Sequence, residues 1–260
     1  MATTVVITGA SMGIGRALAL AWAKRKATLI LSARGQDALE EVAREVEAEG
    51  GRAIVEPGDV TVEEHRAALV ARARETGSLD VLVNNAGRGF LAPALKIDLE
   101  KMRELFELNV FAPLRLVQLA APELQASRGT VVMMSSIAGV VAAPKYAAYS
   151  ASKFAVEAMS MAMRSELAAL GVRVVVIRPG PVATPFRTNA TVAPGEGYDA
   201  PVDPKAQPPE LVAELTLRAV DRATPVVETS AYVRLASAAS RLAPPAVRAA
   251  LRRMATRASN

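Results

Sequence analysis

Residues 3–15 read Thr-Thr-Val-Val-Ile-Thr-Gly-Ala-Ser-Met-Gly-Ile-Gly, and this stretch decides the fold. Its β-branched first half, residues 3–8, predicts a short strand, and the apolar positions beyond Gly15 predict a helix over 14–25. A glycine-rich turn between a strand and a helix exposes free backbone N–H groups where the helix dipole attracts anions. A pyrophosphate is the expected anion, because glycines leave room that a Cβ would fill.

The same stretch also matches a hydrolase pattern. Gly9, Ser11 and Gly13 fit the Gly-x-Ser-x-Gly turn that carries a nucleophilic serine. Such a serine needs an acid and then a histidine downstream. His65 is the only histidine, and it lies in residues 62–69, which are typical of a solvated helix. The hydrolase interpretation is therefore rejected.

A second group of residues suits proton transfer. Tyr149 and Lys153 stand at positions i and i+4, a spacing that puts both on one helix face, and Ser136 lies upstream. An ammonium there stabilises a phenolate, so we expect Lys153 to lower the Tyr149 pKa from about 10 toward neutrality. Alone, the pair also fits a surface tyrosine packed on a lysine stem. The glycine-rich turn favours the catalytic interpretation.

Six features, in this order along the chain, resemble the short-chain dehydrogenase/reductase family. They are residues 8–15, residues 84–87, Asn109, Ser136, residues 149–153 and residues 179–184. The resemblance covers roughly residues 1–185. It implies hydride transfer between a nicotinamide and a carbonyl or alcohol carbon of a small-molecule substrate.

The resemblance assigns catalytic roles to Asn109, Ser136, Tyr149 and Lys153. It makes Tyr149 the general acid or base, places Ser136 on the substrate oxygen, and has Lys153 hold the ribose. Asn109 matches the position whose carbonyl holds a proton-relay water, with a merely helix-kinking asparagine as the alternative. Ser135 and Tyr146 stand beside these positions but do not match them.

The resemblance also implies a set of cofactor contacts. Besides Tyr149 and Lys153, they are Gly9, Ser11, Met12, Gly13, Ile14, Gly15, Arg34, Asp59, Val60, Asn85, Ala86, Gly87, Pro179, Gly180, Val182 and Thr184. Asn84 is expected to brace the sheet instead. Asp59 also fits a helix N-cap.

The cofactor is expected to be NADP(H) rather than NAD(H). Enzymes that prefer NAD place a carboxylate at the end of the second strand, where Ala33 stands here. Arg34 follows, and a guanidinium suits bidentate binding of a phosphate, although a solvated arginine is the alternative. Three residues depart from the family pattern without removing a reacting group: Met12 before the second glycine, and Lys26 and Ala112 where glycines are common.

The chain alternates predicted strands and helices. The strands are 3–8, 28–32, 52–56, 80–83, 129–135, 172–177 and 225–228, and the helices are 14–25, 36–48, 62–75, 99–108, 111–125, 150–169 and 209–222. This order predicts an α/β fold, a single Rossmann-like doubly wound parallel sheet of about seven strands with helices on both faces. We expect one domain over residues 1–260, with the Pro- and Gly-rich segment 186–208 as a substrate lid.

The net charge of +5 is located at the C-terminus. Residues 231–260 contain six arginines and no acidic residue, so the rest of the chain is nearly neutral, which argues against a nucleic-acid-binding domain. Val247, Ala250, Leu251 and Met254 follow helical spacing and predict a basic helical extension. We favour packing beside the substrate cleft or in a subunit interface over contact with an anionic membrane.

The chain contains no cysteine, which excludes disulfides, a thiol nucleophile and a cysteine-based metal site, and no metal is expected. No apolar run is long enough to span a bilayer, and the early first strand leaves no room for a signal peptide. A cytoplasmic location is expected. The resemblance implies a homo-oligomer, a dimer or tetramer, through helices 111–125 and 150–169.

Two alternatives to this enzyme stay open. One is a catalytically silent NADP(H)-binding regulatory or assembly protein, although such a protein has no chemical reason to keep the proton-transfer residues. The other is a sugar-nucleotide epimerase or dehydratase, which uses the same Tyr-x-x-x-Lys pair but a different glycine spacing. The scarcity of aromatic residues and the many small apolar ones favour a lipophilic carbonyl substrate.

Overall fold

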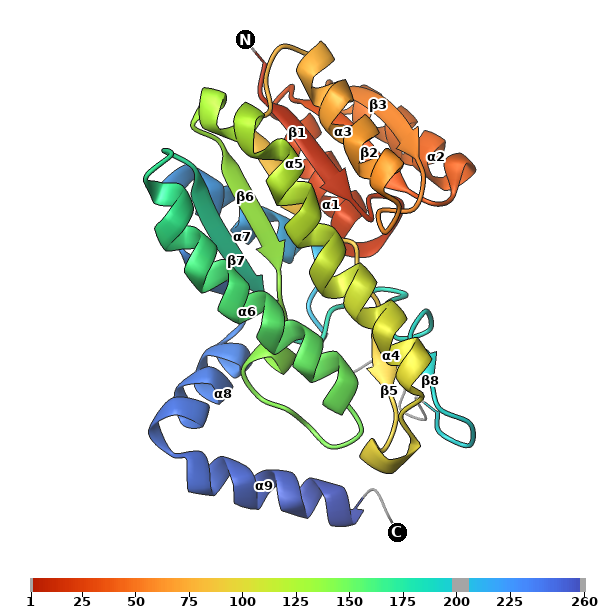
Figure 1. The fold of residues 1–260 in the computed structure, drawn as a ribbon, viewed down its shortest axis with the longest axis vertical. Helices are drawn as coiled ribbons and strands as arrows, with labels where there is room; N and C mark the ends of the chain where they lie inside the picture. Colours follow the sequence, from red (N-terminus) through yellow and green to blue (C-terminus); the bar gives the residue numbers. More distant parts are fainter. Residues whose placement is uncertain (1, 198–205, 258–260) are drawn as a thin grey trace.

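The computed structural model describes residues 2–197 and 206–257 and centres on a parallel sheet (Figure 1). The sheet has seven strands in the order β3-β2-β1-β4-β6-β7-β9. The strands are β1 (Thr4–Thr8), β2 (Thr28–Ala33), β3 (Arg52–Pro57), β4 (Val81–Asn84), β6 (Thr130–Met134), β7 (Arg173–Arg178) and β9 (Val226–Glu228). The strand order reverses between β1 and β4, so a crevice forms beyond the carboxyl ends of these two strands. The predicted fold class is confirmed.

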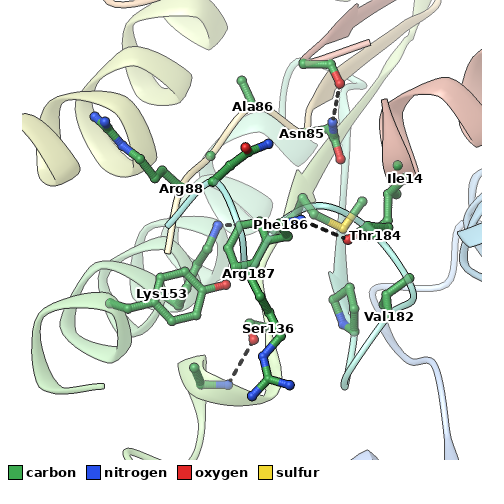
Figure 2. Close-up of a pocket in the computed structure, with 18 of the residues that line it drawn as sticks. Ile14, Asn85, Ala86, Arg88, Ser136, Lys153, Val182, Thr184, Phe186 and Arg187 are labelled. Carbon is green, nitrogen blue, oxygen red and sulfur yellow. Dashed lines mark hydrogen bonds between the residues drawn. The ribbon is translucent and has the colours of Figure 1, made fainter. Parts of the chain in front are cut away.

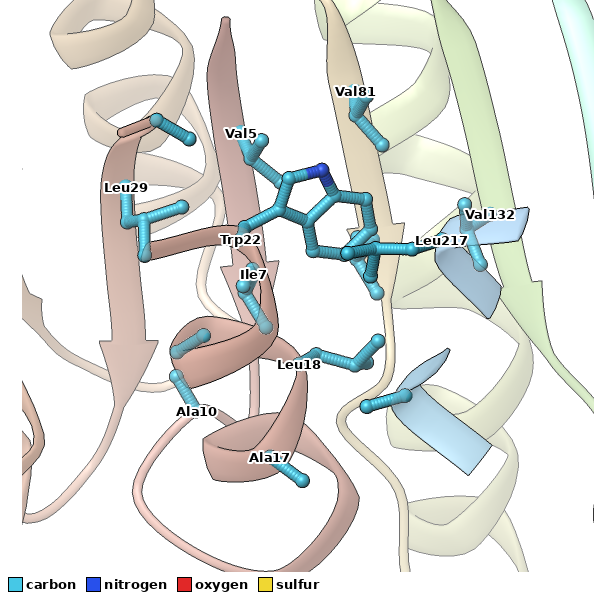
Figure 3. Packing of buried hydrophobic residues seen from close by; sticks show 14 of the residues in the cluster. Val5, Ile7, Ala10, Ala17, Leu18, Trp22, Leu29, Val81, Val132 and Leu217 are labelled. Carbon is cyan, nitrogen blue, oxygen red and sulfur yellow. The ribbon is translucent and has the colours of Figure 1, made fainter. Parts of the chain in front are cut away.

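Helices cover both faces of the sheet, as expected for strands that are apolar on both sides. One face carries α1 (Gly13–Ala23), α2 (Gln36–Ala48) and α7 (Pro209–Arg222), and the other carries α3 (Glu63–Glu75), α5 (Ala112–Ser127) and α6 (Ala147–Ala168). Alternate strand residues supply the two cores: Val5 and Ile7 pack with Trp22, while Val6 faces the opposite side (Figure 3). This double layer fixes the strand ends that hold the site.

The connection from α4 (Leu99–Phe106) to α5 differs from the sequence prediction of two separate helices. A π-helical turn, η2 (Glu107–Phe111), joins them without a break. Turns of this kind widen a helix locally and are frequent at functional sites. Asn109 lies in the middle of η2, so the regular α-helical hydrogen-bond pattern is interrupted where the candidate catalytic asparagine stands.

A small second sheet was not predicted. β5 (Phe90–Leu91) pairs with β8 (Thr191–Val192), close to the 3-10 turn η1 (Ala94–Lys96). Two ion pairs also hold the segment that follows β8. Glu196 accepts from Lys145 at 2.7 Å and lies 3.5 Å from Lys96. The first part of the predicted lid, 186–197, is therefore attached to the body, and residues 198–205 lie outside the described residues.

The chain ends in two helices, α8 (Ala231–Leu242) and α9 (Pro244–Arg257). Both lie at the end of the molecule toward which the strand arrows point (Figure 1). They lie in the segment for which the sequence predicts a basic helical extension. Among the helices of the described ranges, none combines the length and the apolar character that crossing a bilayer requires.

Candidate active site

The glycine turn after β1 forms a cradle with no room for side chains. Gly9 has φ +66°, a left-handed conformation that suits glycine, and a Cβ on Gly15 would lie 2.1 Å from the Gly9 carbonyl oxygen. The N-cap residue of α1, Met12, makes no side-chain capping hydrogen bond, and the first turn of α1 carries no acidic residue. The first N–H groups of α1 therefore suit an anion, and a dinucleotide pyrophosphate fits this cradle.

Asn85 ties the end of β4 to this turn. Its Nδ2 donates to the carbonyl oxygens of Thr8 at 2.9 Å and Gly9 at 3.1 Å. In return, the Thr8 hydroxyl oxygen accepts from the backbone N–H groups of Asn85 and Ala86. These bonds hold the β1 and β4 loops together at the point where the strand order reverses (Figure 2).

The proton-transfer residues come from α6 and from the end of β6. Lys153 Nζ donates to the Met134 carbonyl oxygen at 2.9 Å and lies 5.9 Å from the centre of the Tyr149 ring. Ser136 begins the short turn η3 (Ile137–Gly139), accepts from the Ala138 N–H at 3.1 Å, and hydrogen-bonds Tyr149. Serine, tyrosine and lysine thus meet as the sequence spacing predicts.

The electrostatics of the pair differ from the sequence expectation. Burial raises the pKa of Tyr149 to about 12, and the hydrogen bond with Ser136 offsets only part of this rise. Burial also lowers the pKa of Lys153 to about 8. The expected lowering of the Tyr149 pKa by Lys153 is absent in this state, because desolvation of the enclosed phenol outweighs a lysine that is directed at a backbone carbonyl.

The glycine turn and the proton-transfer residues line one cavity of about 1550 Å³. Its lining includes all the candidate site residues except Gly15 and Asn109. The candidate residues that line it are Gly9, Ser11, Met12, Gly13, Ile14, Arg34, Asp59, Val60, Asn85, Ala86, Gly87, Ser136, Tyr149, Lys153, Pro179, Gly180, Val182 and Thr184. Figure 2 shows Ser136, Lys153 and Thr184 gathered around this space from different segments. Gly15 and Asn109 are buried and do not line it.

The Asn109 side chain is buried and fully used inside the protein. Its Oδ1 accepts from the Arg88 N–H at 3.0 Å, while its Nδ2 donates to the Arg88 carbonyl and to the Ser152 hydroxyl. The side chain therefore fixes the loop after β4 against α6. Asn84, by contrast, donates to the Pro113 carbonyl and contacts Met133 sulfur, which fits the bracing position expected from the sequence.

The far end of the cavity is lined by residues that follow β2 and β3. The Asp59 carboxylate accepts from the Thr61 N–H and hydroxyl, and α3 begins later with Val62 as its N-cap, so Asp59 is not the helix cap. Burial alone would raise the pKa of Asp59, but the Thr61 hydrogen bonds and the nearby Arg34 charge bring it below its ordinary value. This carboxylate stays charged while Arg34 lines the same space.

Sequence reasoning missed several cavity residues. The ring of Phe186 lies 5.7 Å from the ring of Tyr149, and Leu251 and Met254 of α9 line the cavity on another side. Phe186 could have been found from the sequence, because it is an aromatic residue directly after the Pro-Val-Ala-Thr-Pro stretch. The apolar spacing of α9 indicated a helix but not which wall it forms.

Comparison with known proteins identifies this architecture. The sequence model described as short chain dehydrogenase matches residues 3–194. The chain belongs to this family. This short-chain dehydrogenase is 34% identical over 223 residues to ketoacyl reductase HetN of Nostoc sp., covering 85% of this chain and 76% of that protein.

Two solved structures agree closely with the fold of this short-chain dehydrogenase. A short chain dehydrogenase from Burkholderia cenocepacia in complex with NADP superimposes with a TM-score of 0.82 at 28% identity, covering 96% of this chain and 97% of that chain. A Sphingobium yanoikuyae short-chain dehydrogenase in complex with NADPH gives a TM-score of 0.80 at 28% identity, covering 96% and 94%.

Family membership sets the reaction class. This short-chain dehydrogenase is an oxidoreductase that transfers a hydride between a nicotinamide cofactor and a CH–OH or C=O group. Within residues 2–197 and 206–257, no group of His, Cys, Asp or Glu side chains could hold a metal ion.

Proposed function

We propose that this short-chain dehydrogenase reduces, or in reverse forms, a lipophilic carbonyl compound with NADP(H), and that Tyr149 exchanges the proton. One observation carries the proposal: Ser136, Tyr149 and Lys153 line the same cavity as the glycine cradle at the start of α1. The reacting residues and the anion site are therefore open to one extended ligand. Bound NADPH supplies the hydride.

The preference for NADP(H) rests on the charge at the end of β2. Arg34 lines the cavity beside Ala33, so a guanidinium stands next to the position where a carboxylate would repel a 2′-phosphate. The two structural neighbours in complex with NADP and NADPH support the same preference. Asp59 is held by Thr61 and does not occupy the Ala33 position.

The proposed proton transfer follows from the two pKa directions. Burial keeps Tyr149 protonated, so its O–H can donate to a carbonyl oxygen as that oxygen gains negative charge. The Ser136 hydroxyl donates a second hydrogen bond to the same oxygen. A charged Lys153 then stabilises the phenolate left behind, through the 5.9 Å approach to the ring. We assign Asn109 a supporting role, in which its side chain holds the loop after β4 against α6.

A lipophilic substrate is proposed from the walls beyond Ser136. This part of the cavity is lined by small or apolar side chains, namely Val141, Ala143, Tyr146, Phe186, Leu251 and Met254. Such walls favour apolar substrates, because binding removes the apolar surface of both the wall and the substrate from water. Charged side chains reach the same cavity, among them Glu104, Glu107 and Arg187, so the apolar residues form part of its wall.

The test is an NADPH-consumption screen over aldehydes, ketones, steroids, sugars and acyl β-ketones, with the Tyr149→Phe variant as its matched control. The wild type is expected to reduce apolar carbonyl compounds. Tyr149→Phe should lose at least about a hundredfold in kcat, since a positioned general acid contributes this much. NADPH binding, followed by cofactor fluorescence, should stay within a few-fold. An unaffected Tyr149→Phe rate would refute the mechanism, and no turnover at all would favour the regulatory alternative.

The proposed homo-oligomer is supported by exposed apolar residues on α6. Phe154 and Met161 are 43% and 66% exposed and stand seven residues apart, on one face of the helix. Phe111, 52% exposed, adds to the apolar surface at the start of α5. Light scattering of the wild type and of Phe154→Ser with Met161→Ser tests this; a dimeric or tetrameric wild type and a dissociated variant are expected.

A further inference from the structure

Helix α8 directs an apolar ridge away from the protein body. Val233 and Ser237 are buried on its inner side, while Leu235 and Leu242 on the opposite side are 72% and 85% exposed. The two leucines are seven residues apart, so they lie on one face, two helical turns apart. Two large apolar side chains are thus exposed to water on α8, a helix at the end of the molecule toward which the strand arrows point (Figure 1).

Arginines border this ridge. Arg234 and Arg241 stand beside the two leucines with the same seven-residue spacing, and both are exposed. Three exposed arginines of α9 follow: Arg248, Arg252 and Arg253. Residues 231–260 contain no Asp or Glu, and in the described part of the chain no ion pair joins these five arginines to a carboxylate. The positive charge therefore stays available to an external anion.

The two C-terminal helices differ in what their apolar side chains contact. Val247 and Leu251 of α9 are half-buried, and Leu251 lines the active-site cavity together with Met254. The expected packing beside the substrate cleft thus describes the inner side of α9. No residue of the described ranges covers the ridge of α8, so packing within those ranges does not explain Leu235 and Leu242.

We propose that α8 and α9 dock this protein on an anionic lipid bilayer, with Leu235 and Leu242 inserted at the acyl-chain boundary and the arginines on lipid phosphates. Apolar side chains flanked by cations on a helix surface are the pattern that binds such an interface. A lipid surface fits better than a protein partner, because an anionic bilayer offers a continuous layer of phosphates to all five arginines around the ridge. The proposal does not depend on turnover, since docking is measured as binding.

The docking surface lies beside the apolar part of the cavity. Leu251 and Met254 line that cavity from α9, and α9 directly follows α8. A docked molecule would therefore hold the cavity wall close to the lipid. A lipophilic compound dissolved in the bilayer would reach the site with little exposure to water.

Co-sedimentation of the full chain with vesicles tests the proposal. Vesicles of phosphatidylcholine mixed with phosphatidylglycerol should pellet the wild type, and vesicles of phosphatidylcholine alone should pellet far less. The double variant Leu235→Ser with Leu242→Ser should bind the anionic vesicles at least about tenfold more weakly, because it loses the inserted apolar area. Leu170→Ser is the matched control, since this partly exposed leucine lies between α6 and the start of β7, at the amino ends of the strands and away from α8 and α9.

A charge variant supplies the second arm. Arg234→Glu with Arg241→Glu should remove the preference for anionic vesicles, and added salt should weaken wild-type binding in parallel. Equal melting temperatures and equal NADPH turnover on a water-soluble carbonyl compound show that the variants are folded. Equal pelleting of wild type and the double serine variant would overturn the proposal. It would also fail if the wild type stays in solution and the leucines instead govern self-association of the chain.

Discussion

The ring of Phe186 lies against the ring of Tyr149, with centroids 5.7 Å apart and planes inclined by 57°. Gly89 makes room for this contact, because a Cβ there would lie 3.1 Å from the edge of the Phe186 ring. Tilted aromatic pairs of this kind stabilise one another beyond their buried area. Phe186 thus covers the reacting phenol from the segment that follows Thr184, and it is one wall of the cavity (Figure 2).

The Phe186→Ala variant should admit water to Tyr149 and loosen the substrate. We expect kcat/KM for an apolar ketone to fall by about tenfold, mainly through KM, since a lost apolar contact removes binding in both ground and transition state. Phe186→Leu keeps an apolar wall and should recover most of the loss. Steady-state kinetics of the three proteins decide this. A kcat/KM unchanged by Phe186→Ala would mean that the contact does not shape the site.

Arg34→Ala tests the cofactor preference. Loss of a charge-assisted contact to a phosphate costs about 1.5–3 kcal/mol, so the KM for NADPH should rise roughly 10- to 100-fold. The KM for NADH should stay within about twofold, because NADH lacks that phosphate. Arg52→Ala, at the start of β3 and remote from the cavity lining, is the matched control. A parallel loss with both cofactors would assign Arg34 a structural role.

Much of the fold was predictable because local patterns and tertiary structure agree. The β-branched run before Gly9 became β1, and the near-continuous apolar run that begins at Val172 became β7. The paired strands β5 and β8 were not predictable. Each contains only two residues, which is too few for any periodicity, and their pairing depends on a loop that returns from Thr184.

The candidate site, too, was predictable only in part. Spacing predicted that Ser136, Tyr149 and Lys153 meet, because helix geometry fixes neighbours at i and i+4. It did not predict the direction of the Tyr149 pKa, because desolvation depends on what encloses the phenol. Phe186 contributes to that enclosure and reaches Tyr149 only through the fold.

The pH dependence of carbonyl reduction should follow Lys153. Reduction needs a protonated phenol, and with a pKa of about 12 Tyr149 keeps its proton throughout the practical range. Burial lowers the pKa of Lys153 to about 8, so its charge is present below that pH and is lost as the pH rises through it. The rate of reduction should be level in mildly acidic solution and fall through about pH 8.

Lys153→Arg is the control for this profile. A guanidinium keeps its charge beyond pH 10, so the fall near pH 8 should disappear, although the rate itself drops because the contact with the Met134 carbonyl changes. The measurement is kcat/KM for NADPH-dependent reduction across the pH range. A wild-type rate that rises through pH 8 would contradict the assignment.

Lys26 adopts a left-handed backbone conformation, with φ +58°, in the turn between α1 and β2. For a residue with a Cβ this conformation costs roughly 1–2 kcal/mol, whereas glycine adopts it freely. Glycine loses more conformational entropy on folding, which offsets roughly half of that gain. Because the Lys26 side chain is exposed, Lys26→Gly should raise the free energy of unfolding by about 0.5–1 kcal/mol.

Urea unfolding of Lys26→Gly and of Lys24→Gly separates conformational relief from loss of charge. Lys24 ends α1 with φ −58°, an ordinary helical value, so glycine there should lower the free energy of unfolding by about 0.5–1 kcal/mol. The two variants remove the same charge from the same exposed turn. Opposite signs would therefore locate the strain at Lys26, and destabilisation of both would show that its side chain stabilises the turn more than its backbone conformation strains it.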